Sequence, residues 1–118
     1  MGTARPPRDW LANVLSRADV EIPRLCTRFI NNPGTLLPKL PPMRQRVIDA
    51  LGALGASLEV DQEALEKRQR QVRTALAEAP GKAPPDERTD RFIQTVASIY
   101  ALAENFHRVS RSGQDASE

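Results

Sequence analysis

The sequence has a single cysteine, Cys26, and a single histidine, His107. One cysteine excludes an intramolecular disulfide, and one cysteine with one histidine cannot supply the four ligands of a structural zinc site. Acidic residues gather at Asp86, Glu87 and Asp90. Their spacing is not that of a calcium-binding loop, and it suits the first turn of a helix, where the dipole favours acids. We therefore expect no bound metal and no cofactor.

Residues suited to catalysis are equally sparse. Glu104 and Tyr100 share a helical face with His107, a spacing that could hold an acid–base pair, but nothing local places a nucleophile beside them. The glycines of Gly52-Ala53-Leu54-Gly55 are not followed by the Lys-Ser or Lys-Thr pair of a phosphate-binding loop. We therefore predict that the protein is not an enzyme and has no small-molecule substrate.

Long apolar segments and concentrated charge are also missing. No apolar run reaches the about 18 residues of an ordinary membrane span, and residues 1–6 lack the apolar core of a signal peptide. These features predict a cytoplasmic protein. The net charge is +2, and basic residues are spread along the chain instead of forming one block. This distribution argues against nucleic acid as the main partner.

What the sequence does have is helical periodicity over most of its length. Hydrophobic residues make up 40% of the chain and charged residues 27%, as in soluble globular proteins. Apolar residues recur at three- and four-residue spacing in five segments, and no segment alternates as a strand does. We predict one all-α domain over residues 1–118, a small bundle of four or five helices at 7–18, 20–31, 42–56, 61–79 and 86–109.

Four segments lie outside these helices. Proline and glycine identify the connections, and the chain ends have no apolar pattern. These segments are an N-terminal extension at 1–6, a strap at 34–41, a turn at 80–85 and a frayed tail at 110–118.

The strap is rich in proline and leucine. Its prolines predict an extended, polyproline-like path between the N-terminal and C-terminal helices: Pro38, Pro41 and Pro42. A proline-rich ligand for a partner domain is the alternative, but Arg44 does not fall at the spacing that such a ligand needs. We favour a strap whose leucines pack against the chain's own helices: Leu36, Leu37 and Leu40.

Residues 42–79 fit either one helix or two. Apolar residues recur every seven positions, as along a coiled-coil seam: Leu51, Leu58, Leu65 and Val72. Asp61 and Arg68 interrupt this seam, and the charges after Asp61 run from acidic to basic, as at the start of a new helix. Gly52 and Gly55 indicate either close approach of another helix or a break in this one. We favour two helices joined by a short kink.

The helix at 86–109 has more apolar residues than one buried face requires. Five of them would suffice for the core: Phe92, Val96, Ile99, Ala103 and Phe106. The others are then available to bind a partner, including a second copy of the chain: Ile93, Ala97, Tyr100 and Ala101. The alternative is a central helix that buries every face within the bundle.

A chain without catalytic or metal-binding residues is expected to act by offering a surface. We predict a protein–protein interaction module that uses apolar helix surfaces, such as an adaptor, assembly subunit, chaperone or inhibitor. The alternative is a small nucleic-acid-binding regulator that uses the basic face of helix 61–79: Lys67, Arg68, Arg70 and Arg73. Glu63 and Glu66 oppose this alternative, because i,i+4 spacing pairs them with Lys67 and Arg70.

Overall fold

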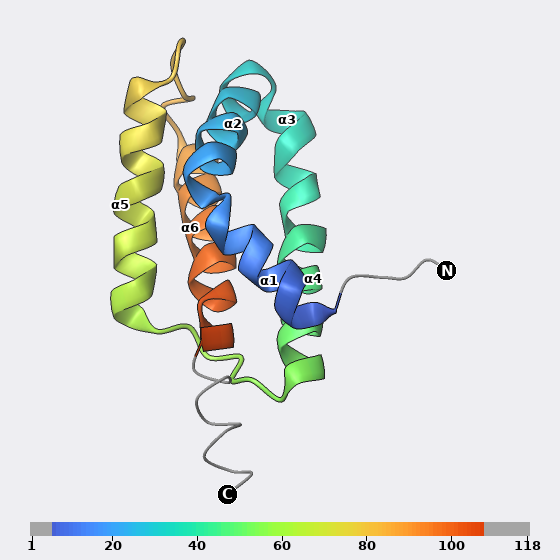
Figure 1. The fold of residues 1–118 in the computed structure, drawn as a ribbon. Coiled ribbons are helices and arrows are strands. Elements are labelled where there is room, and N and C mark those ends of the chain that lie inside the picture. The colour runs from blue at the N-terminus through green and yellow to red at the C-terminus, as the bar shows by residue number, and fades with distance from the viewer. Residues whose placement is uncertain (1–5, 108–118) are drawn as a thin grey trace, which may run out of the picture.

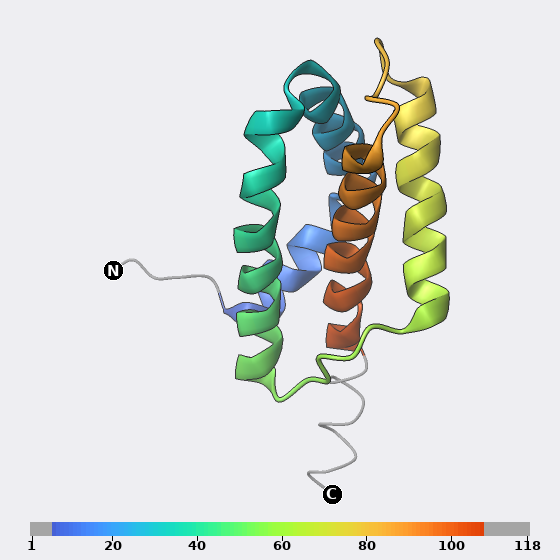
Figure 2. The ribbon, with the colours of Figure 1, turned by 180° about the vertical axis from the view of Figure 1, so that it is seen from behind.

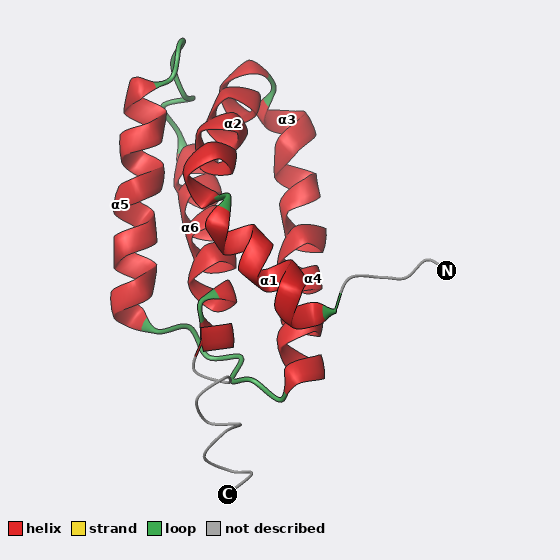
Figure 3. Cartoon of the chain, in the orientation of Figure 1, coloured by secondary structure: helices red, strands yellow, loops and turns green. Residues whose placement is uncertain are grey.

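The computed structural model describes residues 6–107, and all regular structure in that range is helical (Figures 1 and 3). This confirms the prediction of a small all-α bundle. Within the same range no helix is both long and apolar enough to span a membrane. Most of the predicted extension and the whole predicted tail lie outside the described residues. The elements in chain order are α1 (Pro7–Ser16), α2 (Ala18–Asn31), α3 (Pro33–Leu36), the 3₁₀ helix η1 (Leu37–Lys39), α4 (Leu40–Leu54), α5 (Gln62–Glu78) and α6 (Glu87–Ala103).

Helix α6 is the centre of the bundle. It packs against α5, α4, α1 and α2, and the view from behind shows it between α4 and α5 (Figure 2). Nine of its side chains are buried, from Phe92 to Ala103. Phe92 stacks on Phe29 of α2, with ring centroids 4.3 Å apart and ring planes 9° from parallel. Because neighbours cover it on several sides, this helix is apolar nearly all round.

Helices α1 and α2 meet at Arg17, which ends the first and precedes the second. The bounds predicted from the sequence, 7–18 and 20–31, place this break at residue 19, and that detail is wrong. Asp19 lies in the first turn of α2, and its carboxylate accepts a hydrogen bond from the Gln71 amide of α5 at 3.1 Å. The carboxylate still lies near a helix N-terminus, where negative charge is favourable.

The strap at 34–41 is helical, so the predicted extended path is wrong. The prolines fall where a helix tolerates them, because the first N–H groups of a helix have no partner within it. Each of the three successive segments has a proline at its first or second position, Pro33 in α3, Pro38 in η1 and Pro41 in α4, and Pro42 follows at the third position of α4. The leucines do pack against the core, two of them buried and one partly buried: Leu36, Leu40 and Leu37.

Residues 42–79 form two helices, as favoured from the sequence. Helix α4 ends because Gly55 takes a left-handed conformation with φ 72°, which residues with a side chain rarely adopt. Asp61 caps α5 by accepting a backbone hydrogen bond at 3.0 Å in the first turn. The connection at 55–61 is longer than a kink. A Cβ at Gly52 would meet no described atom within 4 Å, so close helix approach does not explain that glycine.

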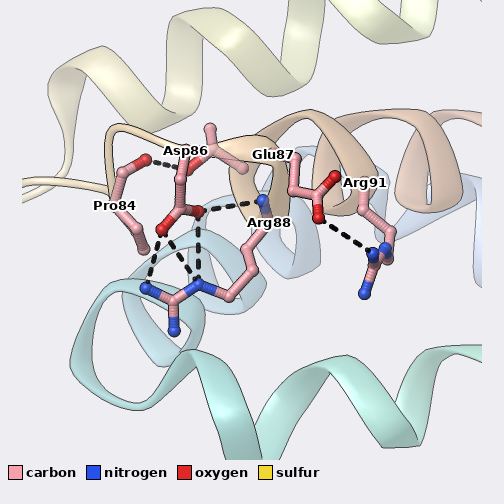
Figure 4. A network of polar contacts seen from close by, with 6 residues as sticks. Pro84, Asp86, Glu87, Arg88 and Arg91 are labelled. Atoms are coloured by element: carbon pink, nitrogen blue, oxygen red, sulfur yellow. Dashed lines mark hydrogen bonds and ion pairs between the residues drawn. The ribbon is translucent and has the colours of Figure 1, made fainter.

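Polar contacts hold the turn that precedes α6 (Figure 4). The Asp86 carboxylate caps α6 by accepting a hydrogen bond from the Arg88 backbone N–H at 2.9 Å, and it also pairs with the Arg88 guanidinium. These hydrogen bonds hold the pKa of the Asp86 carboxyl below its usual value. The Thr89 hydroxyl donates to the Pro84 carbonyl oxygen and closes the turn predicted at 80–85.

One further helical turn, residues 105–107, follows α6; the last two residues of the predicted helix lie outside the described range. Asn105 in this turn is buried. Its Nδ2 donates to the carbonyl oxygens of Ser57 at 2.8 Å and of Glu59 at 2.9 Å. Asn105 therefore fastens the connection between α4 and α5 to the end of the central helix.

Candidate functional site

The four residues predicted to face a partner are buried inside the bundle. None of them is more than 5% exposed: Ile93, Ala97, Tyr100 and Ala101. The expectation that these residues form an exposed partner-binding face is wrong. Helices α1, α2, α4 and α5 surround α6 and cover its additional apolar side chains. The possible homodimer considered from the sequence relied on the same face and loses its basis.

The basic face predicted for nucleic acid divides into two parts. Three of its residues are exposed on α5: Lys67, Arg70 and Arg73. Arg68 instead pairs with Glu104 near the end of α6, with Nε 2.7 Å from Oε2, and its side chain is only 12% exposed. It is therefore not placed to contact phosphates. The carboxylates of Glu63 and Glu66 form no ion pair with a residue in the described part of the chain, so the two predicted i,i+4 pairs are absent there.

A cleft of about 300 Å³ opens between α1, α2 and α4, with α6 as its floor. Helices α2 and α4 are connected at one end through α3 and η1 and do not pack closely on each other (Figure 1). Apolar side chains form the walls and floor: Trp10, Val14, Leu25, Met43, Val47, Ile99 and Tyr100. The polar and charged lining residues are Asn13, Arg17, Glu21, Arg28 and Arg46. Known ligand pockets span roughly 300–1,000 Å³, so this cleft is a small one.

Trp10 and Arg46 bring α1 and α4 together at the cleft. Trp10 is partly buried, and the guanidinium carbon of Arg46 lies over its ring, 4.8 Å from the centroid. This is a cation–π contact, which holds the guanidinium in place and leaves its N–H groups for other partners. None of those groups has a hydrogen-bond acceptor among residues 6–107. The Arg46 guanidinium is therefore held beside the cleft with N–H groups that remain able to donate hydrogen bonds to a ligand.

Charge around the cleft is unbalanced. The Glu21 carboxylate accepts a hydrogen bond from Arg17 at 3.0 Å and lies 3.6 Å from a guanidinium nitrogen of Arg24. Arg28 is exposed and has no ion-pair partner between Pro6 and His107. Within residues 6–107, the lining thus carries three guanidinium groups, from Arg17, Arg28 and Arg46, against the one carboxylate of Glu21. This surplus of two positive charges attracts anionic groups to the cleft.

Tyr100 lies at the floor of the cleft, with the Arg68 guanidinium over its ring at 5.8 Å from the centroid. Burial raises the pKa of Tyr100 to about 12; the Glu21 carboxylate also raises it, whereas the Arg68 and Arg17 guanidinium groups lower it. The phenol is therefore protonated at neutral pH. Its hydroxyl has no hydrogen-bond acceptor within the described residues, so it is a further unused donor.

A second, more open groove of about 650 Å³ lies between α2 and α5. A side-chain hydrogen bond crosses it: Gln71 of α5 donates to Asp19 of α2 at 3.1 Å, and Arg68 on the same helix as Gln71 donates to the Gln71 amide oxygen at 2.8 Å. Its charged lining residues carry both signs: Asp19, Lys67, Arg68, Arg70 and Glu78. The groove therefore favours no class of charged ligand.

The side chains that could take part in catalysis do not form a cluster. The Cys26 thiol is fully buried against the Val72 carbonyl oxygen, and burial raises its pKa to about 11. Glu104 of the acid–base face considered from the sequence is paired with Arg68, while His107 is exposed. Among the residues that the structure describes, no cluster of His, Cys, Asp and Glu could hold a metal ion. The cleft and its hydrogen-bond donors are therefore better suited to binding a ligand than to catalysis.

The cleft combines residues that no local sequence pattern connects. Trp10 fits the apolar stripe of its helix, and Arg28 and Arg46 fall on polar helix faces. Their chain positions lie in three separate helices, so periodicity could not place them together. The sequence shows that Trp10 is the single tryptophan, but only the folded chain shows that it shares a cleft with Arg28 and Arg46.

No protein-family model matches this chain, and comparison with curated proteins and with solved structures finds no significant match. The function is therefore argued from the chemistry of the cleft alone.

Proposed function

We propose that the protein is a non-enzymatic protein–protein interaction module that binds its partner in the cleft between α1, α2, α4 and α6. The observation that carries this proposal is the partly exposed Trp10 beside Arg46 at the edge of an apolar cleft. Tryptophan and arginine contribute most of the binding energy at many interfaces, especially next to a pocket that the partner can fill. Met43 adds a wall that adapts to the shape of the incoming side chain.

The size of the cleft limits what enters it. A helix with its side chains is about 10–12 Å across, and a volume of about 300 Å³ does not enclose one. The cleft instead accepts individual side chains from a segment that lies across its opening. An adaptor, assembly subunit, chaperone or inhibitor uses such a site to recognise a short part of a larger protein.

The test is capture of a defined partner from a cytoplasmic extract of the native host, identified by mass spectrometry. Asn13→Phe fills the cleft with a larger side chain and removes no side-chain hydrogen bond found in the described chain. We expect this variant to lose the partner. Asn13→Met, which also enlarges the side chain and adds no charge, repeats the test if the phenylalanine variant does not fold.

The control is Arg73→Gln, which changes an exposed residue of α5 outside the cleft. We expect it to retain the partner, with a melting temperature like that of the wild type. If folded Asn13→Phe and wild-type proteins retrieve the same partner in equal amounts, the cleft is not the interface.

Nucleic acid is the alternative partner, and the exposed cations of α5 are the observation in its favour: Lys67, Arg70 and Arg73. The internal ion pair of Arg68 removes one member of the predicted face, and Glu63 and Glu66 expose carboxylates on the same helix. Binding to duplex DNA or RNA that weakens steeply with salt, and that Arg70→Gln and Arg73→Gln abolish, would favour this alternative.

A further inference from the structure

Hydrogen-bond donors predominate around the cleft. Arg28 and Arg46 have no carboxylate partner, and the Tyr100 hydroxyl has no acceptor, within the described residues. Among the described residues, Glu21 supplies the only lining carboxylate, and it is already shared between two arginines, Arg17 and Arg24. A ligand that satisfies the unused donors has to bring acceptors, and a guanidinium binds a carboxylate especially well because both groups are planar and oppositely charged.

The positions of the two unused arginines add a geometric requirement. Arg28 belongs to α2 and Arg46 to α4, two of the helices whose side chains line the cleft. Trp10 and Met43 supply apolar surface in the same cleft. A matching occupant therefore carries an apolar side chain for the cleft and acceptors that reach arginines on two helices.

We infer, on the basis of the proposed function, that the occupant is an acidic protein segment in which an apolar side chain is flanked by aspartate or glutamate. The surplus of two guanidinium groups in the lining matches such a segment, whose carboxylates pair with Arg28 and Arg46. A nucleic acid would bring phosphates and bases that stack on an aromatic ring such as that of Trp10, but no aliphatic side chain to lie against Met43. The apolar walls therefore favour a protein segment.

Trp10 makes this inference directly measurable, because it is the only tryptophan in the chain and it lines the cleft. Its fluorescence reports occupation of the site in the intact, unlabelled protein. The probes are two pools of short, tryptophan-free synthetic peptides. Each peptide carries one Leu, Met or Phe, flanked by Asp and Glu in the first pool and by Asn and Gln in the second.

The acidic pool is expected to change the Trp10 fluorescence at concentrations where the amide pool has no effect, and added salt should weaken this binding. Arg28→Gln and Arg46→Gln should each weaken it by about threefold to tenfold, the range of partly exposed charge pairs. Arg73→Gln removes the same charge outside the cleft and should leave the affinity unchanged.

Equal binding of the two pools, or no response to the acidic pool at saturating concentration, would overturn the acidic occupant. A duplex DNA that binds more tightly than the acidic peptides and requires Arg28 and Arg46 would overturn it in favour of nucleic acid. If Asn13→Phe abolishes partner capture while the pools are indistinguishable, the proposed function stands and this inference fails. If Asn13→Phe affects neither capture nor peptide binding, both fail.

Discussion

Arg68 and Glu104 form an ion pair that joins α5 to the end of α6, with Nε 2.7 Å from Oε2. The two side chains are 12% and 27% exposed, whereas the other ion pairs found within residues 6–107 lie between residues close in sequence. Arg68 also donates to Gln71 and lies over the Tyr100 ring. The arginine that interrupts the apolar seven-residue pattern of α5 thus takes part in packing between helices.

Removing the carboxylate of this pair should destabilise the protein. We expect Glu104→Ala to lower the free energy of unfolding by about 2–3 kcal/mol, because it leaves a largely buried guanidinium without its counter-charge. Glu87→Ala is the control: its partner Arg91 is 3.9 Å away and both side chains are exposed, so the change should stay below about 0.5 kcal/mol. Urea denaturation followed by circular dichroism measures both. Equal effects would mean that the buried pair contributes no more than a surface pair.

Asn105 holds the connection between α4 and α5 against the end of α6 through two hydrogen bonds that its amide nitrogen donates. Within the described residues its Oδ1 has no partner, so the amide nitrogen alone makes the contacts. Asn105→Ala should lower the free energy of unfolding by about 2 kcal/mol. Asn105→Asp should lower it further, since a carboxylate cannot donate and would face two carbonyl oxygens. Hydrogen exchange should quicken in residues 55–61 of both variants. A wild-type exchange pattern in the aspartate variant at neutral pH would contradict this role.

Replacing two glycines near the end of α4 with alanine should change the stability in opposite directions. Gly52 lies inside α4 with open space where a Cβ would go, so Gly52→Ala should raise the free energy of unfolding by about 0.5–1 kcal/mol. Gly55 has φ 72°, so Gly55→Ala should lower it by about 1–2 kcal/mol. Thermal and urea denaturation measure both. Loss of stability in both variants would show that Gly52 has a packing role.

Alkaline pH should weaken the fold through two buried groups. Burial raises the pKa of Cys26 from 9.0 to about 11 and of Tyr100 from 10.0 to about 12. The unfolded chain loses these protons first, so the stability that they contribute is fully present below about pH 9 and is lost as pH rises toward 12. Urea denaturation across this range should show Cys26→Ala losing less stability than the wild type between pH 9 and 11. Parallel pH profiles would contradict the prediction.

The helical strap should contribute to the core through Leu40 more than through Leu37. Leu40 is 1% exposed, whereas Leu37 is partly buried at the edge of the core. Leu40→Ala should lower the free energy of unfolding by about 2–4 kcal/mol, as other core truncations do, and Leu37→Ala by less. Urea denaturation of the two variants shows which substitution lowers the free energy of unfolding more. An unchanged melting temperature in the double variant would mean that the strap is not part of the core.

The sequence was sufficient for the fold class because helical periodicity is a local property. The apolar spacing of each segment predicts a helix whatever surrounds it, and Asp61 and Asp86 act as caps at helix starts. The strap shows where local inference failed. Proline opposes a helix interior but suits a first turn, and its meaning at 34–41 depends on where each short helix begins.

Tertiary packing decided the rest. The sequence showed that 86–109 is apolar on several faces, yet a central helix and a partner-binding helix have the same pattern. The surrounding helices resolve that choice in favour of a central helix. The cleft depends on packing even more, because Trp10, Arg28 and Arg46 line one cleft only after α1, α2 and α4 pack around α6. Periodicity identifies the face of one helix, whereas the relative placement of several helices determines which side chains share a site.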